Sequence, residues 1–345
     1  MKRRKNKKIL AAVVYDVFMP RRTAPDELEA AAMEEDARYV CETLAAAGLE
    51  AVAAPIDGNI LAALNALKKI NPAVIVNLCE SFRNRSSCEA QVAGLFEMAG
   101  WPCTGNSSNA LWLCEDKFRA KAVLQSCGLP TPKGWLVSGE KDIPAKADFP
   151  LIVKPNFEDG GIGIYADSVA YDCRALAKRV KRVICKYHQP ALIEEFIKGR
   201  EFNVALIEIP GSRRIKVLPL SEISFAGLPP DLPRVVGYEA KWIQKHPFYK
   251  GTTPVCPARN VPPETAKLLR ALALETWRVM RLNGYARIDF RVSAGGRPYI
   301  LDVNPNPDYS ADAGLARSLA AAGISLPDFW RGQVVLAMES GKTNP

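Results

Sequence analysis

The stretches Tyr285-Ala-Arg-Ile-Asp-Phe290 and Tyr299-Ile-Leu-Asp-Val-Asn-Pro-Asn-Pro307 carry the most information in this sequence of 345 residues. Both are rich in apolar residues, and the segment Ser293-Ala-Gly-Gly-Arg297 between them predicts two adjacent strands joined by a turn. Pro305 and Pro307 end the second strand, because proline cannot donate a hydrogen bond to a sheet. The chain therefore leaves this hairpin in a defined direction.

The polar side chains of this hairpin suit phosphoryl transfer. Alternate side chains of a strand share a face, so Arg287 should lie beside Asp289, and Asp302 beside Asn304 on the next strand. Two carboxylates and an amide oxygen are hard ligands that suit Mg²⁺, and the guanidinium can face a developing oxyanion. The alternative is a solvated hairpin with a charged outer face, and the apolar, proline-terminated second strand favours the functional site.

The charge pattern gives little support to a nucleic-acid partner. The formal net charge is +9, but basic residues alternate with acids outside residues 2–8 and the segment Arg179-Val-Lys-Arg182. Such runs are usually solvated faces. A nucleotide substrate explains part of the excess equally well.

Cysteine and histidine usage narrows the chemistry further. The nine cysteines form no Cys-x-x-Cys pair, which fits a reduced, cytoplasmic protein. His188 and His246 are the only histidines, which argues against a histidine base or a His-rich zinc site. No apolar run reaches the roughly 18 residues needed to span a bilayer, so we expect neither a membrane segment nor a signal peptide.

The first part of the chain alternates strands and helices, which predicts a doubly wound parallel sheet. The expected strands are residues 8–14, 50–54 and 73–78, and the expected helices are residues 27–47, 60–70 and 89–99.

The remainder predicts an α+β region with mostly antiparallel strands. Its expected helices are residues 116–127, 171–187, 263–282, 312–321 and 326–338, and its expected strands, besides the hairpin, are residues 151–154, 164–166, 191–196, 201–209 and 213–220. Residues 228–257 show little periodicity, and a long irregular stretch in a compact domain is usually a lid or binding loop.

Three further segments have a bearing on nucleotide binding. Val153-Lys-Pro155 delivers a lysine from a strand, and Gly160-Gly-Ile-Gly163 lets backbone amides approach phosphate oxygens, although a plain hairpin turn remains an equal alternative. In Leu192-Ile-Glu-Glu-Phe-Ile-Lys-Gly-Arg-Glu201, Glu194 and Phe196 could share a face and leave a strand edge for adenine, with the last glutamate accepting from ribose; a surface hairpin is the alternative.

Tyr238-Glu-Ala-Lys241 lies inside the irregular stretch. A closing loop there could carry Lys241 onto a terminal phosphate, and the alternative is an exposed loop lysine.

In this order the segments resemble the ATP-grasp superfamily, and most closely the D-alanine:D-alanine ligase family, from about Val74 to the C-terminal helices. The segments that carry the resemblance are Pro102-Cys-Thr-Gly105, Glu115-Asp-Lys-Phe-Arg-Ala-Lys121, Ile152-Val-Lys-Pro155, Leu192-Ile-Glu-Glu195, Glu201-Phe-Asn-Val204, Tyr238-Glu-Ala-Lys241, Cys256-Pro-Ala258, Arg287-Ile-Asp289 and Asp302-Val-Asn304. It implies an N-terminal α/β (pre-ATP-grasp) domain over residues 1–113, a central ATP-grasp lobe over 114–195 and a C-terminal lobe with the metal site over 196–340.

The resemblance also implies roles for single residues. It places Lys117 and Lys154 on phosphates, under the loop of Gly160 and Gly161, and Lys241 at the γ-phosphate. It places Glu194, Glu195 and Ile197 at adenine and Glu201 at ribose. Asp289, Asp302 and Asn304 would bind Mg²⁺, and Arg287 would stabilise the tetrahedral intermediate. The implied cofactors are ATP and two Mg²⁺ ions, with Mn²⁺ as an alternative.

The chain departs from D-alanine ligases mainly around the substrates. Those enzymes usually have Glu, Ser, Tyr, Gly and Ser at the positions of Asp302, Gly160, Trp242, Asp308 and Ala313, and a His-Gly-containing loop in place of Leu78-Cys-Glu-Ser81. The charge of Asp308 would repel a second α-carboxylate on the acceptor, unless this residue caps the helix expected over residues 312–321.

The resulting hypothesis is a cytoplasmic ATP-dependent carboxylate-amine ligase that forms an amide through an acylphosphate. Its partners would be small-molecule carboxylates and amines, without nucleic acid or membrane, and a homodimer is left open. The alternatives are a true D-alanine:D-alanine ligase, a catalytically idle ATP-binding protein, and a basic protein that binds nucleic acid.

Overall fold

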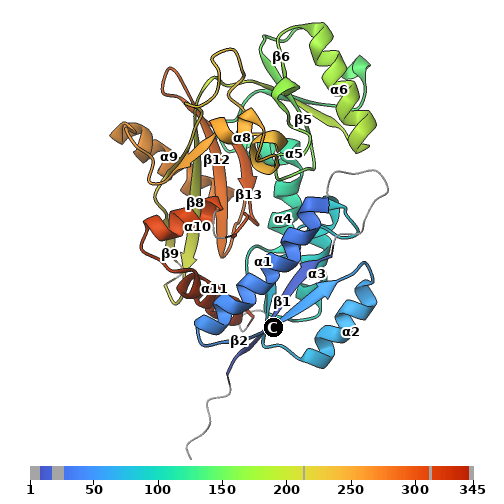
Figure 1. The fold of residues 1–345 in the computed structure, drawn as a ribbon, viewed down its shortest axis with the longest axis vertical. Coiled ribbons are helices and arrows are strands. Elements are labelled where there is room, and N and C mark those ends of the chain that lie inside the picture. Colours follow the sequence, from blue (N-terminus) through green and yellow to red (C-terminus); the bar gives the residue numbers. More distant parts are fainter. Residues whose placement is uncertain (1–7, 18–26, 213, 311–312, 342–345) are drawn as a thin grey trace, which may run out of the picture.

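The structure is a computed structural model that describes residues 8–17, 27–212, 214–310 and 313–341. Among the helices within these ranges, none combines the length and the apolar character that crossing a membrane would require. The elements form three sheets, shown in chain colours in Figure 1.

The N-terminal sheet is parallel, with the strand order β2-β1-β3. Its strands are β1 (Leu10–Asp16), β2 (Glu50–Ile56) and β3 (Val74–Asn77), and the helices of this region are α1 (Glu27–Ala46), α2 (Ile60–Ile70) and α3 (Glu89–Met98). β1 is buried beyond its first residue, as expected for the central strand of a parallel sheet covered on both faces. The predicted α/β arrangement is therefore confirmed.

The second sheet is antiparallel, with the strand order β4-β7-β5-β6. It contains β4 (Gly134–Val137), β5 (Leu151–Pro155), β6 (Val169–Ala170) and β7 (Ala191–Glu195), with α6 (Cys173–Tyr187) packed against it, and α4 (Ser108–Glu115) and α5 (Lys117–Ser126) precede it. The strand expected over residues 164–166 is wrong. The Ser168 hydroxyl accepts the Tyr165 N–H at 2.9 Å, which closes a turn, and the strand begins only at Val169.

The third sheet has six strands, and all of its pairings are antiparallel. The order is β11-β10-β8-β12-β13, with β9 paired to β8, and the strands are β8 (Gly199–Ile209), β9 (Arg214–Val217), β10 (Ser221–Ser224), β11 (Thr253–Val255), β12 (Tyr285–Ser293) and β13 (Pro298–Asn304). The strand expected over residues 213–220 is shorter in the structure: β9 ends at Val217, and β10 begins only at Ser221, because Pro219 between them has no N–H for a ladder. Residue 213 lies outside the described residues.

Within the irregular stretch of residues 228–257 lie the short helices α7 (Tyr238–Trp242) and α8 (Pro247–Gly251) and the short strand β11. The longer helices α9 (Pro263–Val279), α10 (Gly314–Ala321) and α11 (Leu326–Ser340) complete the fold. The C-terminal helix lies back beside the N-terminal sheet (Figure 1). Tyr285, Phe329 and Trp330 belong to a core that the two regions share.

A second core fills the other face of the third sheet, where α5 and α9 pack. The apolar side chains of the β12–β13 hairpin pack into this second core, which gives the hairpin a rigid base for the polar side chains on its opposite face.

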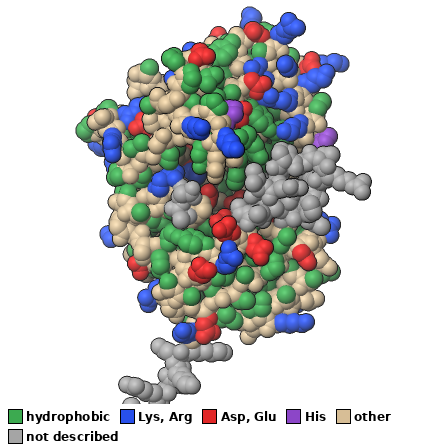
Figure 2. Space-filling model, in the orientation of Figure 1, with side chains coloured by type: hydrophobic (Ala, Val, Ile, Leu, Met, Phe, Trp, Pro, Cys, Tyr) green, Lys and Arg blue, Asp and Glu red, His purple; other side chains and the backbone are tan. Residues whose placement is uncertain are grey.

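Charged side chains are unevenly spread over the surface. On the face in Figure 2, Lys and Arg gather toward the upper right, where α6 lies, and acidic side chains gather near the centre. The basic residues of α6 are Arg174, Lys178, Arg179, Lys181, Arg182 and Lys186.

Candidate active site

The β12–β13 hairpin brings the predicted polar residues together. Arg287 pairs with Asn304 across the strands, and Asp289 pairs with Asp302. All four are only partly buried, whereas Ile288 between the first two is fully buried in the core. The structure thus confirms that these side chains share one face, while their chemical roles stay predictions.

A β-bulge sets the direction of Asp302. Phe290 pairs with Ile300, but Asp289 pairs with Asp302, so Leu301 is the extra residue. In a regular strand Ile300 and Asp302 would share a face, and one of them would be misplaced. The bulge lets Ile300 enter the core while Asp302 faces the site.

Asp289 is fully engaged by neighbouring side chains. The Arg287 guanidinium donates to both carboxylate oxygens, from Nε to Oδ1 at 2.8 Å and from Nη2 to Oδ2 at 2.9 Å. Asn304 donates to Oδ2 at 3.1 Å, and Asn203 of β8 donates to Oδ1 at 2.7 Å. The guanidinium is therefore held in a fixed plane beside the carboxylate.

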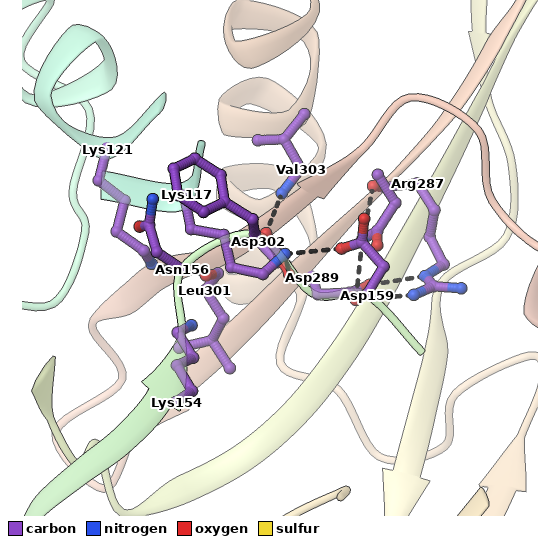
Figure 3. A network of polar contacts seen from close by, with 12 residues as sticks. Lys117, Lys121, Lys154, Asn156, Asp159, Arg287, Asp289, Leu301, Asp302 and Val303 are labelled. Atoms are coloured by element: carbon purple, nitrogen blue, oxygen red, sulfur yellow. Dashed lines mark hydrogen bonds and ion pairs between the residues drawn. The ribbon is translucent and has the colours of Figure 1, made fainter. Parts of the chain in front are cut away.

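Asp302 is paired with the first residue of α5 (Figure 3). Lys117 Nζ lies 2.9 Å from Asp302 Oδ2 and 2.6 Å from Asp159 Oδ1. Burial raises the pKa of Asp302, but Lys117 and then Lys154 outweigh it and bring the pKa to about 2. This carboxylate is therefore ionised at neutral pH.

Lys154 meets a buried carboxylate together with a lysine that sequence reasoning missed. Glu194 Oε1 lies 2.8 Å from Lys121 Nζ, and Oε2 lies 2.8 Å from Lys154 Nζ. The Glu194 side chain is only 2% exposed; burial raises its pKa, but Lys121 and Lys154 lower it overall. These three side chains link α5, β5 and β7.

The strand edge expected for adenine is wrong over residues 191–195. β7 lies inside its sheet between β4 and β5, because the short β4 that sequence reasoning missed covers that edge. The N–H of Glu195 donates to Lys133 O at 2.9 Å, and that of Phe196 donates to Pro150 O at 3.0 Å. The N–H groups of Glu195 and Phe196 are therefore already engaged, and the adenine contacts of Glu194, Glu195 and Ile197 stay predictions.

Glu201 also has a partner that was not predicted. Arg291 Nη2 on β12 donates to Glu201 Oε2 and also to Arg234 O, the latter at 2.8 Å. Burial raises the pKa of Glu201, although Arg291 acts against it. A ribose role for Glu201 stays a prediction.

The segment that carries Lys241 lies over the glycine-rich loop. Trp242 Nε1 donates to Gly160 O at 3.1 Å, and Tyr238 N donates to Ile164 O at 2.8 Å. Gly161 has a φ of +80°, and a Cβ there would lie 3.1 Å from the backbone of residue 237, so glycine permits this close approach.

Lys241 is an exposed residue of α7, as the alternative interpretation of this lysine predicts, although its ammonium group lies in a less hydrated place than the rest of the side chain. Desolvation of the ammonium lowers its pKa, Arg287 adds to the effect, and Asp289 and Asp308 oppose it. Lys241 therefore interacts electrostatically with the polar face of the hairpin, and its phosphate role stays a prediction.

Asp308 does not cap the following helix. Its Oδ1 accepts hydrogen bonds from Ser310 N at 2.8 Å and from Ser310 Oγ at 2.7 Å. The N-cap of α10 is Ala313, which makes no side-chain cap. The capping alternative is therefore wrong, and the charge of Asp308 acts on Arg287 and Lys241.

Several site residues were missed because their contacts are tertiary. Asn156 is wholly buried and ties the end of β5 to the start of α5, donating to Asp116 Oδ1 at 2.8 Å and accepting from Phe118 N at 3.0 Å. Glu115 is buried nearby, where desolvation and then Asp159 raise its pKa to about 7.

Lys121 was the one omission with a sequence signal. It follows Lys117 by four residues and so shares its helix face.

The chain is similar to several D-alanine ligases. Residues 132–332 match the family model described as "D-ala D-ala ligase C-terminus". The chain is 31% identical over 252 residues (73% of it, 70% of the relative) to the uncharacterized protein y4sG of Sinorhizobium fredii. It is 30% identical over 307 residues (88% and 92%) to the D-alanine–D-alanine ligase of Desulforudis audaxviator.

Solved structures show the same fold. The D-alanine–D-alanine ligase from Bacillus anthracis complexed with ATP has a TM-score of 0.75 at 19% identity, covering 98% of this chain and 100% of that chain. The VanG D-Ala:D-Ser ligase from Enterococcus faecalis has a TM-score of 0.72 at 17% identity, covering 96% and 100%.

Proposed function

This chain belongs to the D-Ala–D-Ala ligase family, and we propose that it joins a carboxylate to an amine at the expense of ATP. The predicted ATP-grasp architecture is confirmed by the likeness to the solved ligases. The observation that carries the proposal is that Lys117 pairs with Asp302 of the β12–β13 hairpin, close enough to Lys154 for the charge of that lysine also to lower the pKa of Asp302.

ATP is proposed to bind between the second and third sheets. Lys117 and Lys154 bring ammonium groups to one place from α5 and β5, and Gly160 and Gly161 allow backbone amides to approach phosphates. Ile197 directly follows the occupied amides of Glu195 and Phe196 and would contact adenine, with Glu201 toward ribose. The Bacillus anthracis relative was solved with ATP, which supports this ligand.

The donor set fits Mg²⁺. Asp289, Asp302 and Asn304 carry hard oxygen atoms on one face, and a metal at Asp289 would replace one of the hydrogen bonds that its carboxylate accepts. Among the described residues no group of three or more His, Cys, Asp or Glu is placed to hold a metal, so phosphates and water would complete the coordination. When bound, two such ions, or Mn²⁺ instead, would neutralise charge on the transferring phosphoryl group.

The protein residues would then act by position and charge. A carboxylate oxygen attacks the γ-phosphorus, ADP leaves, and the acylphosphate formed is attacked at its carbonyl carbon by an amine, which releases phosphate. Lys241 would neutralise the γ-phosphate, and Arg287 would stabilise the oxyanion of the tetrahedral intermediate. No side-chain nucleophile is required, because positioning and electrostatics supply the rate.

The acceptor is proposed to differ from D-alanine. The charge of Asp308 reaches Arg287 and Lys241, so an acceptor carboxylate beside it would meet a like charge. An amine without a carboxylate there, or one with an additional ammonium group, fits better. A true D-alanine:D-alanine ligase is the second candidate, favoured by the names of several relatives.

We also retain the domain boundaries at residues 113 and 195, a cytoplasmic location and a homodimer as proposals. All nine cysteines are free thiols, which supports a reducing compartment.

A phosphate-release screen tests the function. Purified protein is given Mg·ATP with paired panels of carboxylates, amino acids and diamines. We expect phosphate release only when a carboxylate and an amine are both present, with D-alanine a poor acceptor. Nucleotide binding without release on any pair would overturn the ligase assignment, and efficient release with D-alanine alone would favour the second candidate.

A further inference from the structure

We propose that Lys121 is a positioning residue that braces the β13 bulge and thereby holds Asp302 for the nucleotide–Mg²⁺ complex. The inference rests on the proposed function for the metal role of Asp302. Lys121 would touch neither substrate nor metal, and it would act through the backbone of Ile300 and Leu301.

The bulge needs such support because β13 is the last strand of its sheet. Backbone groups on an outer edge have no neighbouring strand and must find other partners when buried. Ile300 N donates to Pro130 O at 2.8 Å. The carbonyl oxygens of Leu301 and Ile300 accept from Lys121 Nζ at 2.5 Å and 3.4 Å. The side chain of one buried lysine therefore closes the edge at the bulge.

The Lys121 ammonium has three partners, two carbonyl oxygens as hydrogen-bond acceptors and one carboxylate as an ion-pair partner. Besides the two carbonyls, it lies 2.8 Å from Glu194 Oε1, and the Lys121 side chain is only 7% exposed. Figure 3 shows Lys121 and Lys117 reaching from α5 toward the same part of β13. Lys117 contacts the Asp302 side chain, and Lys121 contacts the backbone directly before it.

The charge of Lys121 links the two sheets that would enclose ATP. Glu194 on β7 binds Lys121 and also Lys154 on β5, the strand that leads into the glycine-rich loop. A displacement of β13 relative to these strands would stretch the contact from Lys121 to Leu301. Lys121, Glu194 and Lys154 thus couple the position of Lys154, a proposed phosphate contact, to that of Asp302.

The effect should resemble the loss of an outer-shell partner of a metal ligand, which typically costs 10- to 100-fold in metal affinity or activity. Lys121→Met removes both the charge and the donors. Lys121→Gln keeps a neutral donor and serves if the Met variant does not fold. Arg119→Met is the matched control, because it removes a cation from the same helix. The Arg119 side chain is 61% exposed and contacts Asp116 rather than β13.

Two measurements that do not depend on turnover are made on the full chain. Hydrogen exchange of residues 299–304 in the protein without ligands should be faster in Lys121→Met than in the wild type or Arg119→Met. Calorimetric titration of Mg²⁺ into protein with a non-hydrolysable ATP analogue should show an affinity about tenfold weaker, with nucleotide affinity without Mg²⁺ changed far less.

The wild-type titration is read first, because absence of Mg²⁺-dependent nucleotide binding there would contradict the proposed function itself. Against a wild type that binds, unchanged exchange and unchanged Mg²⁺ affinity in Lys121→Met, with only a lower melting temperature, would overturn the positioning role. An equal loss of nucleotide affinity with and without Mg²⁺ would make Lys121 a nucleotide contact and would also overturn it.

Discussion

The proposed nucleotide side and the proposed substrate side of the site are held in different ways. On the nucleotide side, Lys117, Lys121 and Lys154 are nearly buried and pair with carboxylates of other elements at 2.6 to 2.9 Å. On the substrate side, Trp242 is held by one hydrogen bond to a backbone carbonyl, and Asp308 bonds to a residue two positions along the chain.

The difference shows where this chain can vary. Removing one partner from a buried charge network leaves the other unpaired and is costly, so the nucleotide side tolerates little change. A backbone carbonyl accepts from any donor that reaches it, so the contact between residue 242 and Gly160 O does not depend on an indole. Substrate choice would therefore lie in the loops, and ATP chemistry in the paired core.

The largest effect should come from the proposed Mg²⁺ ligands of the β12–β13 hairpin. Asp302→Ala and Asn304→Ala should each abolish turnover while leaving the fold intact, because each removes an oxygen ligand and Lys117 keeps its contact with Asp159. ATP should still bind, more weakly. Steady-state phosphate release measures turnover, and thermal unfolding measures whether the fold is intact. Normal turnover in both variants would show that the hairpin holds no required metal.

The next effect concerns the guanidinium. Arg287→Ala should lower kcat on the order of 10²-fold, as the loss of one oxyanion donor does, with little change in ATP affinity. Kinetics on the identified substrates and ATP binding by calorimetry give the comparison. A variant with only a raised KM for ATP would place Arg287 on the nucleotide side.

A smaller change is expected in specificity. Asp308→Gly should shift preference toward an amino acid over its decarboxylated amine by about tenfold or more, because a like charge beside the acceptor carboxylate is removed. The ratio of kcat/KM for the two acceptors is the readout. An unchanged ratio would mean that Asp308 serves only its local turn with Ser310.

The smallest effect is expected at Trp242. Trp242→Phe removes the N–H that donates to Gly160 O, and a net hydrogen bond of about 0.5 to 1.5 kcal/mol predicts a two- to tenfold loss in kcat/KM for the amine acceptor. Trp112→Phe is the control, since its indole is exposed on α4 beside Arg119. Equal kcat/KM values for the two variants would show that the hydrogen bond from Trp242 to Gly160 O does not contribute to acceptor use.

Local signals predicted many elements of the fold. α2 begins and ends where the sequence indicated, because Asn59 caps its start through Ala62 N and Asn71 ends it in a left-handed conformation. α4 was missed, because Asp116 ends it and also caps α5, so two helices meet without a loop. β4 was missed because it is short and only its last residue is buried.

The site was predictable where the chemistry lay along one strand. The hairpin residues alternate in the sequence and meet in the structure. The pairing of Lys117 with Asp159 and the contact of Lys121 with Leu301 join distant segments, and a carbonyl acceptor leaves no mark in a sequence. The ion pairs of the three buried lysines could therefore be found only in the tertiary structure.

The central claim is that this chain activates a carboxylate with ATP. The most direct test uses the substrate pair found in the phosphate-release screen, with the carboxylate oxygens labelled with ¹⁸O. Attack of a carboxylate oxygen on the γ-phosphorus, followed by displacement by the amine, predicts that each phosphate released carries one labelled oxygen. Unlabelled phosphate, released while the amide forms, would contradict an acylphosphate and with it the proposed reaction.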